Sequence, residues 1–522
     1  MIERRLTPLT KSMLAAVTTV MGSQMRARIV NAAGIGSLVK VEGDGYQIIG
    51  RISEIALEES TGQYVLVVDL VGEIAQGQFQ RGVSHHPLPE AAVYAVDADD
   101  MHALYDEPSI ADFRVGVLYD DAQQPALVQI DDLLGKHFAV LGSTGSGKSC
   151  TVALVLSSIL NAHPNAHVLM LDPHNEYASA FGDQAEMLNV DNLRLPLWLL
   201  DSEEAVRVLV VGGTPAERET QAMILRDSIL RARRHFAGDV AGSSSFTVDT
   251  PVPYRIADLV RFINEAMGRL DKPDTTFPYL RLRSRIESLR ADNRFAFMFG
   301  EGLDVPDILH DVLGRLMRIP VHGKPIAILD LSGVPSDVTE VVVSLCCRLI
   351  FDFALWSKGT AMPPMLIVCE EAQRYIPSHE NSAFGATSRV ITRIAKEGRK
   401  YGLSLALVSQ RPSELAPEAL SQCGTIFALR MTSEVDQQFI ARGVPDFAQG
   451  MLAALPSLPT QQALVSGEGV RLPVRIRMDD LPPQRRPHSA GASFSTAWQT
   501  DRTDGVLREE GIRRWRMQAR QP

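Results

Sequence analysis

Residues 142–149 read Gly-Ser-Thr-Gly-Ser-Gly-Lys-Ser, a spacing of glycines, lysine and hydroxyl groups that can hold a chain of phosphates. Glycine tolerates positive φ, so successive backbone N–H groups of such a turn can point into one concavity. Lys148 is expected to reach the β- and γ-phosphates, and the Ser149 hydroxyl to ligate Mg²⁺. A glycine-rich turn without chemistry is the alternative, but the apolar run before it and the amphipathic run after it favour a strand, loop and helix. The sequence thus predicts a nucleoside triphosphate site formed by Gly142, Ser143, Thr144, Gly145, Ser146, Gly147, Lys148, Ser149 and Cys150.

Two adjacent acids, Glu370 and Glu371, end a second apolar run at 365–369. Phosphoryl transfer to water needs a holder for magnesium and a group that orients the water. Adjacent residues at the end of a strand point in different directions, so one carboxylate can face Mg²⁺ while the other faces the water. We assign Glu370 to Mg²⁺, through water, and Glu371 to the role of catalytic base. A pair of solvated surface acids is the alternative.

Two further apolar runs carry polar groups at their ends. Gln410 follows one of them and can sense the γ-phosphate or hold the water. Asp172, His174 and Glu176 lie at the end of the other. Because the carboxyl ends of parallel strands collect ligand groups, we expect these three side chains near the phosphates. Glu176 is also a reserve candidate for the catalytic base.

Positive charge for the γ-phosphate can come from a basic segment that contains Arg393 and Arg399. The segment is expected to be helical, so some of its cations must lie on a solvated face. In oligomeric NTPases, however, an arginine often completes the site of a neighbouring subunit. One of these two residues is therefore predicted to be a trans-acting arginine finger, and the sequence leaves open which.

The chain of 522 residues is 45% hydrophobic and carries a formal net charge of −10. This length suggests about two to four domains with packed cores. The chain as a whole is not a polycation, so any contact with nucleic acid must come from a local basic lining. Its five cysteines lack the spacing of zinc sites and are interpreted as reduced thiols. Neither a signal peptide nor an apolar run of about 18 residues is found, which indicates a cytoplasmic protein without a membrane contact.

Short alternating runs separated by glycine-containing turns dominate the first part of the chain. Strands are predicted at 25–30, 37–41, 47–52, 64–74 and 92–96. Several short strands at this spacing indicate a small β-barrel or sandwich. His85 and His86 are adjacent there, and neighbours in a strand face opposite sides, so we interpret them as polar surface and not as metal ligands.

Further along, the pattern changes to apolar runs separated by helices, which predicts an α/β fold with a mostly parallel sheet buried on both faces. Its strands are expected at 137–141, 168–172, 326–331, 365–369, 403–408 and 425–430. Between them the β pattern stops, and helices are predicted at 216–236, 256–270 and 279–292. The basic helical segment 281–290 is interpreted as a solvated face, with a face toward nucleic acid or another subunit as the alternative.

These patterns predict the domain organisation. A β-barrel is expected at 1–100, the core at 101–214 and 322–480, an α-helical insertion at 215–321 and a C-terminal tail at 481–522. After Pro473 the sequence turns polar and rich in proline, and its last segment is rich in arginine. This tail is expected to become ordered only on a neighbour.

Five motifs in this order resemble those of the HerA family, in the HerA–FtsK branch of RecA-like P-loop ATPases. They are the phosphate loop, Asp172-Pro-His-Asn-Glu-Tyr, Glu370-Glu-Ala-Gln-Arg-Tyr-Ile-Pro, Glu397-Gly-Arg-Lys-Tyr-Gly and Ser409-Gln-Arg-Pro. The resemblance covers most of the chain and implies an N-terminal β-barrel, a RecA-like core and an α-helical insertion. Asn175 stands where the family commonly has glycine, and Gln373 where it commonly has histidine. Neither departure removes a phosphate, metal or base position.

The resemblance also implies a function. It implies an ATP- and Mg²⁺-dependent homo-hexameric ring that has ATP sites between subunits and double-stranded DNA in its pore. It implies a separate partner, either a NurA-type nuclease in DNA-end processing or a phage-defence effector such as a sirtuin-type NAD-consuming enzyme, with the barrel as the expected docking surface. The candidate DNA contacts are Arg374, Arg389 and Arg393, on or beside the loop at 376–388. The competing interpretation is a nucleotide-gated ring that assembles and activates an effector without processive DNA movement.

Overall fold

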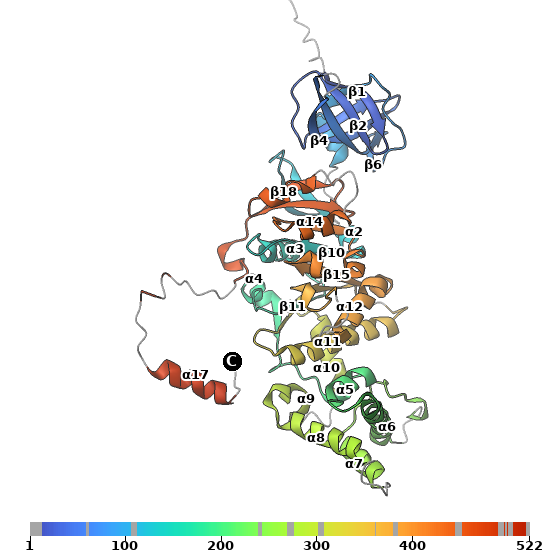
Figure 1. Cartoon of the computed structure of the whole chain (residues 1–522), viewed down its shortest axis with the longest axis vertical. Helices are drawn as coiled ribbons and strands as arrows, with labels where there is room; N and C mark the ends of the chain where they lie inside the picture. The colour runs from blue at the N-terminus through green and yellow to red at the C-terminus, as the bar shows by residue number, and fades with distance from the viewer. Residues whose placement is uncertain are drawn as a thin grey trace, which may run out of the picture. The chain divides into compact units, whose positions relative to one another are not determined.

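The computed structural model describes residues 13–58, 62–105, 112–238, 243–268, 276–300, 307–360, 362–378, 385–443, 451–488, 495, 498–499 and 505–517 (Figure 1). The chain forms two compact units. Unit 1 consists of Met1–Pro164, Glu371–Gln373 and Ser404–Pro483, and unit 2 of Asn165–Glu370, Arg374–Leu403 and Gln484–Pro522. The domain boundaries drawn from the sequence stay predictions.

The first part of unit 1 is a β-barrel, drawn in blue in Figure 1. Its described strands follow the order β2-β1-β7-β3-β4-β5, and β2 also pairs with β5, which closes the ring. β5 pairs with β2 through its first part and with β6 through its last part. Aliphatic side chains such as Val39, Ile52 and Val68 fill the interior. The elements are β1 (Met13–Met21), β2 (Gln24–Ile29), β3 (Leu38–Glu42), β4 (Tyr46–Glu58), β5 (Gln63–Ala75), β6 (Gln78–Arg81), β7 (Ala92–Ala95) and α1 (Ala98–Leu104).

The strands predicted in this region are confirmed, and the closed ring decides for a barrel against a sandwich. β1 and β6 were not predicted. β1 lacks strict alternation, since the side chains of Ala15–Val17 are all buried, and β6 is only 4 residues long. The ring of His85 stacks on Tyr46 at a centroid distance of 4.1 Å, and its Nδ1 lies 3.0 Å from a carboxylate oxygen of Glu73. These contacts fit the polar role expected for His85.

Unit 1 also contains described strands in the order β15-β10-β16-β17-β18-β8-β9. β10 is parallel to both β15 and β16, whereas the pairs from β16 to β9 are antiparallel. The parallel strands were predicted and the antiparallel extension was not. The elements are β8 (Asp112–Leu118), β9 (Pro125–Gln129), α2 (Ile130–Gly135), β10 (Phe138–Leu141), α3 (Lys148–Ala162), β15 (Leu403–Ser409), α13 (Pro417–Leu420), β16 (Thr425–Ala428), α14 (Glu434–Ala441), β17 (Gln462–Gly467) and β18 (Val474–Met478).

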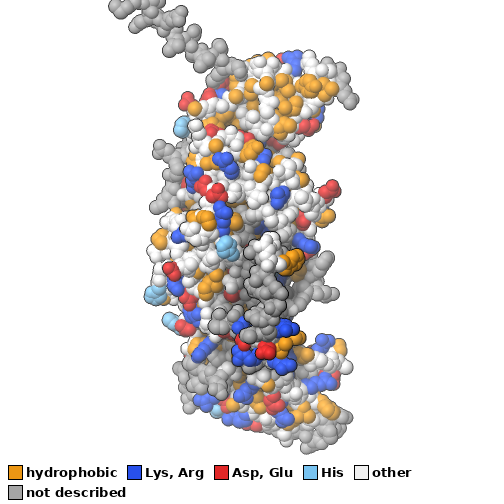
Figure 2. All heavy atoms as spheres, turned by 90° about the vertical axis from the view of Figure 1, so that its left-hand side faces the viewer, with side chains coloured by type: hydrophobic (Ala, Val, Ile, Leu, Met, Phe, Trp, Pro, Cys, Tyr) orange, Lys and Arg blue, Asp and Glu red, His pale blue; other side chains and the backbone are white. Residues whose placement is uncertain are grey.

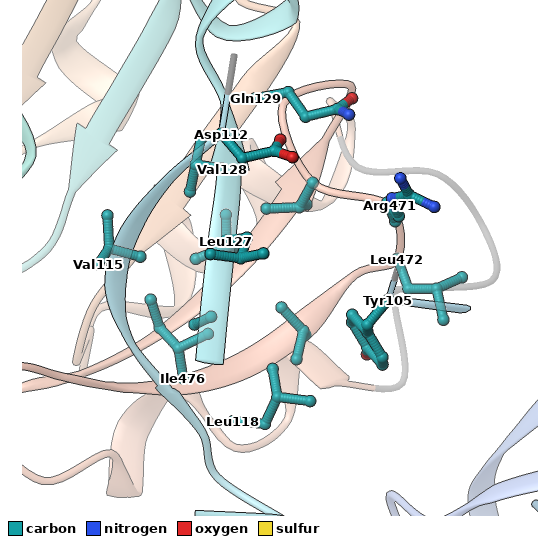
Figure 3. A pocket seen from close by; sticks show the side chains of 14 residues that line it. Tyr105, Asp112, Val115, Leu118, Leu127, Val128, Gln129, Arg471, Leu472 and Ile476 are labelled. Carbon is teal, nitrogen blue, oxygen red and sulfur yellow. The ribbon is translucent and has the colours of Figure 1, made fainter. Parts of the chain in front are cut away.

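The prediction that the chain turns polar after Pro473 is wrong for β18. Val474, Ile476 and Met478 are buried and alternate with Arg475 and Arg477, so the strand has one apolar face. The arginines concealed this period in the sequence. β8, β9, β17 and β18 supply much of the lining of a small cavity, which is mainly aliphatic (Figure 3). We interpret it as part of the packed interior of the sheet.

Unit 2 contains a parallel sheet in the order β12-β13-β11-β14. Three of these strands were predicted, and β12 was not. The strands are β11 (Val168–Asp172), β12 (Ala185–Leu188), β13 (Ile326–Asp330) and β14 (Met365–Cys369). The helices are α4 (Ala178–Phe181), α5 (Ser202–Leu209), α6 (Pro215–Ala237), α7 (Ile256–Met267), α8 (Phe277–Ala291), α9 (Ala296–Phe299), α10 (Leu309–Met317), α11 (Ser336–Trp356), α12 (Gly385–Glu397) and α17 (Gly505–Met517).

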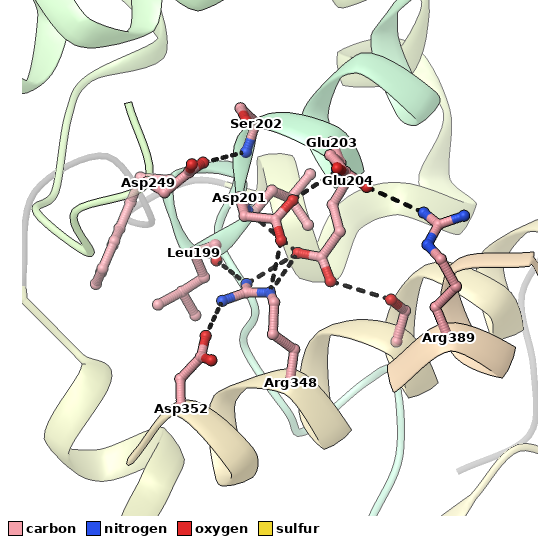
Figure 4. Close-up of polar contacts among 12 residues, drawn as sticks. Leu199, Asp201, Ser202, Glu203, Glu204, Asp249, Arg348, Asp352 and Arg389 are labelled. Carbon is pink, nitrogen blue, oxygen red and sulfur yellow. Dashed lines mark hydrogen bonds and ion pairs between the residues drawn. The ribbon is translucent and has the colours of Figure 1, made fainter. Parts of the chain in front are cut away.

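The helical insertion is confirmed, and α6, α7 and α8 contact one another in it. A buried ionic cluster joins α5 to α11 (Figure 4). The Arg348 guanidinium on α11 lies 2.8 Å from Glu204 and 3.3 Å from Asp201, and it donates to the Leu199 carbonyl over 2.6 Å. Asp201 also caps the N-terminus of α5 by accepting from the backbone N–H of Glu204. Each buried charge of this cluster therefore has a partner, which offsets part of the cost of its burial.

The basic segment that was expected to be helical forms α12, which begins at Gly385, and after Glu397 it continues as the 3₁₀ turn η7 (Gly398–Tyr401). Gly402 ends it with φ 74°, in the left-handed conformation that glycine commonly supplies at the end of a helix. The last segment, expected to order only on a neighbour, contains the helix α17. Within the described parts of the chain, none of the helices is long and apolar enough to cross a membrane.

Candidate nucleotide site

The phosphate loop lies between the buried strand β10 and the helix α3 in unit 1. Gly145 and Gly147 have φ values of 73° and 98°, which glycine adopts without strain. A Cβ atom at Gly142 would lie 2.7 Å from the Ser146 hydroxyl oxygen and 2.9 Å from the Cβ of Leu429, so only glycine fits there. The glycines of the motif thus shape the turn, as the sequence predicted.

Backbone hydrogen bonds hold this loop against the neighbouring strand ends. The Gly142 N–H donates to the Ser409 carbonyl over 3.2 Å, and the Ser143 N–H donates to the Arg430 carbonyl over 2.9 Å. Lys148 is 8% exposed, and its Nζ donates to the Ser143 carbonyl over 3.2 Å. The ammonium group is therefore folded over the loop, where a phosphate chain would meet it.

The loop fits a bound triphosphate with magnesium. α3 is 15 residues long, and the N-terminus of such a helix attracts anions through its backbone N–H groups and its dipole. The Ser146 hydroxyl is buried and finds no hydrogen-bond partner among the described residues. When ATP is bound, Gly142–Ser149 would hold its phosphates and Ser149 would ligate Mg²⁺. Cys150 follows in the first turn of α3 and is partly buried.

Glu371 is attached to the end of β15 by a chain of side-chain hydrogen bonds. Its carboxylate accepts from the Gln373 amide, and the Gln373 amide oxygen accepts from the Ser409 hydroxyl over 2.7 Å. Gln410, the next residue, accepts from the Thr144 hydroxyl of the phosphate loop over 2.5 Å. Unit 1 therefore brings together Glu371, Gln410 and the phosphate loop, three parts that the sequence assigned to one site.

Both positions that depart from the family pattern have a physical explanation. Asn175 has φ 53°, in the left-handed region that glycine favours and that asparagine tolerates better than most residues. Gln373 supplies one amide donor and one acceptor, both of which are used in the chain to Glu371. Glu371 itself has φ 53°, a strained conformation for glutamate. Such strain at a non-glycine residue is typical of functional positions.

The remaining acidic candidates lie in unit 2. Glu370 is 3% exposed and accepts from the Tyr177 hydroxyl over 2.8 Å. Asp172 is fully buried and accepts from the backbone N–H groups of His174 and Tyr177. Burial raises the pKa of the Asp172 carboxyl above its usual value. His174 is exposed and Glu176 is half-buried in the same loop.

The candidate arginines are all exposed in unit 2. Arg393 lies with its guanidinium 4.5 Å above the Phe351 ring and 3.7 Å from Glu397, and Arg399 lies in η7. Arg389 forms a 3.1 Å ion pair with Glu203, visible in Figure 4. Arg374 is the last residue of the 3₁₀ turn η6 (Ala372–Arg374). Residues 379–384 of the loop predicted to contact DNA lie outside the described residues.

Two residues at this site were missed from the sequence. Arg430, just after β16, donates from Nη2 to the Gly145 carbonyl over 3.2 Å, so a second cation lies at the phosphate loop. Ser409 was noted only as part of a motif, yet its hydroxyl links Gln373 to β15. The signal available for both was their position at the end of a strand beside β10, because parallel strands bring their carboxyl ends together.

The chain is similar in sequence to known helicases. Residues 113–350 match the family model described as the central domain of helicase HerA. The chain is 24% identical over 477 residues to a probable DNA double-strand break repair helicase HerA of Methanocaldococcus jannaschii, covering 84% of this chain and 89% of the relative. It is 26% identical over 381 residues to the DNA double-strand break repair helicase HerA of Saccharolobus solfataricus, covering 68% of this chain and 69% of the relative.

Among solved structures, VirB4 of Thermoanaerobacter pseudethanolicus aligns with a TM-score of 0.48 and 16% identity, over 73% of this chain and 99% of that one. The phosphate loop lies within the residues that match the family model, and the paired glutamates follow that match in the chain. The chain is similar to HerA helicases over most of its length, and its residues 113–350 match the family model of their central domain.

Proposed function

We propose that this chain is a Mg²⁺-dependent ATPase that moves double-stranded DNA through a homo-hexameric ring and works with a separate nuclease or defence effector. The observation that carries the proposal is the hydrogen-bond chain on Glu371 in the unit that contains the phosphate loop. A held carboxylate is needed to orient water for hydrolysis and is not needed for nucleotide binding alone. The relatives named as DNA double-strand break repair helicases support DNA as the substrate.

The ring is supported by the exposure of both finger candidates. Arg393 and Arg399 project from α12 and η7 toward solvent in the single chain. The Arg393 guanidinium stacks on the Phe351 ring and makes a long contact of 3.7 Å to Glu397. An exposed and partly pre-oriented guanidinium is suited to complete the site of a neighbouring subunit.

Contact with DNA would come from a local lining and not from the whole surface. Figure 2 shows Lys and Arg side chains interspersed with acidic ones, in keeping with the formal net charge of −10. Arg374, Arg389 and Arg393 remain the candidate contacts, and all are exposed. Because Arg389 pairs with Glu203, binding to DNA would break this exposed ion pair and replace it with a contact to a phosphate. Exposed pairs of this kind are weak, so the exchange costs little.

The partner is proposed to dock on the barrel, which exposes apolar side chains (Figure 2). Leu57 and Tyr64 lie opposite each other on β4 and β5 and are 55% and 62% exposed. Val30 is 54% exposed and directly follows β2. The end of β2 pairs with the first part of β5, where Tyr64 lies. Three large apolar side chains at one end of the barrel are typical of a protein interface.

The decisive experiment measures displacement of a triplex-forming oligonucleotide from duplex DNA by the purified chain with ATP and Mg²⁺. ATP-dependent displacement that is lost in Lys148→Ala supports translocation. If the wild-type chain hydrolyses ATP on DNA but displaces no third strand, translocation is refuted. Nucleotide-dependent activation of an effector without such displacement would instead support a gated assembly ring.

A further inference from the structure

A directional chain of hydrogen bonds in unit 1 leads from the backbone to the Glu371 carboxylate. The Arg411 N–H donates to the Ser409 hydroxyl oxygen over 3.1 Å. The Ser409 hydroxyl donates to the Gln373 amide oxygen over 2.7 Å, and the Gln373 amide nitrogen donates to Glu371. Each hydroxyl or amide group in the chain accepts one hydrogen bond and donates the next. The chain ends on a carboxylate, which can only accept when ionised. Such a chain fixes the orientation of the Gln373 amide and, through it, that of Glu371.

The local backbone explains why these side chains meet. Glu371 leaves the end of β14 in a left-handed conformation, and η6 follows at once. The turn places the Gln373 side chain beside the carboxylate two residues before it. Ser409 is the last residue of β15 and is fully buried, so its hydroxyl presents a fixed donor.

At the end of β15, the backbone and the side chain of Ser409 contact different partners. The Ser409 carbonyl accepts from the Gly142 N–H of the phosphate loop, while its hydroxyl serves Gln373. The neighbouring Gln410 contacts the loop through Thr144. A change confined to the Ser409 hydroxyl therefore leaves the backbone contact to the phosphate loop in place.

We propose that Gln373 and Ser409 are positioning residues for Glu371 and set the rate of ATP hydrolysis without contributing to ATP affinity. The inference rests on the proposed role of Glu371 as the base. Neither side chain is assigned to phosphate or Mg²⁺. Loss of one neutral hydrogen bond in the chain should slow turnover by about tenfold, the effect of roughly 1.4 kcal/mol on a barrier.

The test compares Ser409→Thr with Ser409→Val in the full chain. The two replacements have nearly the same shape, and only threonine keeps the hydroxyl. We expect Ser409→Thr to retain turnover and Ser409→Val to lose about tenfold in kcat with the KM for ATP unchanged. Ser404→Ala is the matched control, since the Ser404 hydroxyl is also buried on β15 but finds no partner among the described residues.

Gln373→Met provides a second variant that does not alter the buried strand, because Gln373 is only half-buried. It keeps the length of the side chain and removes both hydrogen bonds, so kcat should fall at least as far as in Ser409→Val. Wild-type kcat in both variants, with Glu371→Gln inactive, would overturn the positioning role and leave the base assignment intact. A rise in the KM for ATP that matches the fall in kcat would also overturn the positioning role. So would a loss of kcat in Ser409→Thr equal to that in Ser409→Val. Normal hydrolysis by Glu371→Gln would instead refute the base.

Discussion

The Thr144 hydroxyl lies 2.5 Å from the Oε1 atom of Gln410, so a side-chain hydrogen bond joins the exposed part of the phosphate loop to the end of β15. The same segments are joined by the backbone bond from Gly142 to Ser409. A side chain bonded to the loop that cradles phosphates is suited to respond to the γ-phosphate. Gln410 can therefore link nucleotide state to the strand that also holds Ser409.

Gln410→Leu should lower kcat by about tenfold or more while ATP affinity stays within about twofold, because Gln410 is proposed to act on the γ-phosphate or the water. Thr144→Val removes the partner hydroxyl without changing shape and should have the smaller effect on kcat. Steady-state ATPase assays with titration of a fluorescent ATP analogue measure both quantities. Equal losses in the two variants would mean that Gln410 acts only by holding the loop.

Lys148→Ala should abolish tight ATP binding, whereas Glu371→Gln should bind ATP and hardly hydrolyse it. Lys148 is proposed to contact the phosphates already in the ground state, and Glu371 is proposed to act chiefly on the attacking water. Loss of the water-orienting group costs on the order of 10²-fold or more in turnover. Equilibrium binding and single-turnover hydrolysis distinguish the two. Normal hydrolysis by Glu371→Gln would move the role of base to Glu370 or Glu176.

Much of the fold follows from local patterns in the sequence. The apolar runs of β10, β11 and β14 are fully buried, and such continuous runs are what a parallel sheet covered on both faces requires. The antiparallel extension was harder to predict because β18 interleaves Arg475 and Arg477 with its buried residues. A charged face on a short strand near prolines resembles a loop when the partner strands are unknown.

The site divides in a similar way. Gly145, Gly147 and Lys148 belong to one contiguous motif, so their spacing alone carries the prediction. Arg430 is 285 residues from the Gly145 carbonyl it contacts, and Ser409 is 36 residues from Gln373. Contacts over such separations depend on which strands become neighbours in the sheet, and no local pattern specifies that order.

Arg393 or Arg399 should act across a subunit boundary. Each arginine is changed to alanine, and the variant is mixed with Glu371→Gln under conditions in which subunits exchange. Mixed rings then contain interfaces in which both parts are intact, so ATPase activity should partly recover. If neither alanine variant loses activity alone, the finger hypothesis fails for both residues. If the arginine instead acts within its own chain, the ATPase activity should not change on mixing.

DNA binding should be directed at the backbone, insensitive to sequence and steeply dependent on salt. A ring that moves along DNA needs equivalent contacts at each step, and phosphates are the groups that every base pair repeats. The logarithm of affinity should fall by several units per tenfold rise in salt if several phosphates are neutralised together. Fluorescence anisotropy with duplexes of unrelated sequence measures both properties. A flat salt dependence or a marked sequence preference would contradict a translocating pore.

Finally, the proposed effector should bind through the barrel, and binding should fail when Leu57 and Tyr64 are both replaced by glutamate. The two side chains are exposed cross-strand neighbours, so the replacements add charge to the proposed interface without entering the barrel interior. Val435→Glu is the matched control, because Val435 is 65% exposed on α14, outside the barrel. Co-purification and a titration by calorimetry measure capture of the effector, and ATPase activity reports that the phosphate loop is intact. Undiminished capture by the double variant would move the docking surface to the helical insertion or the arginine-rich C-terminal segment.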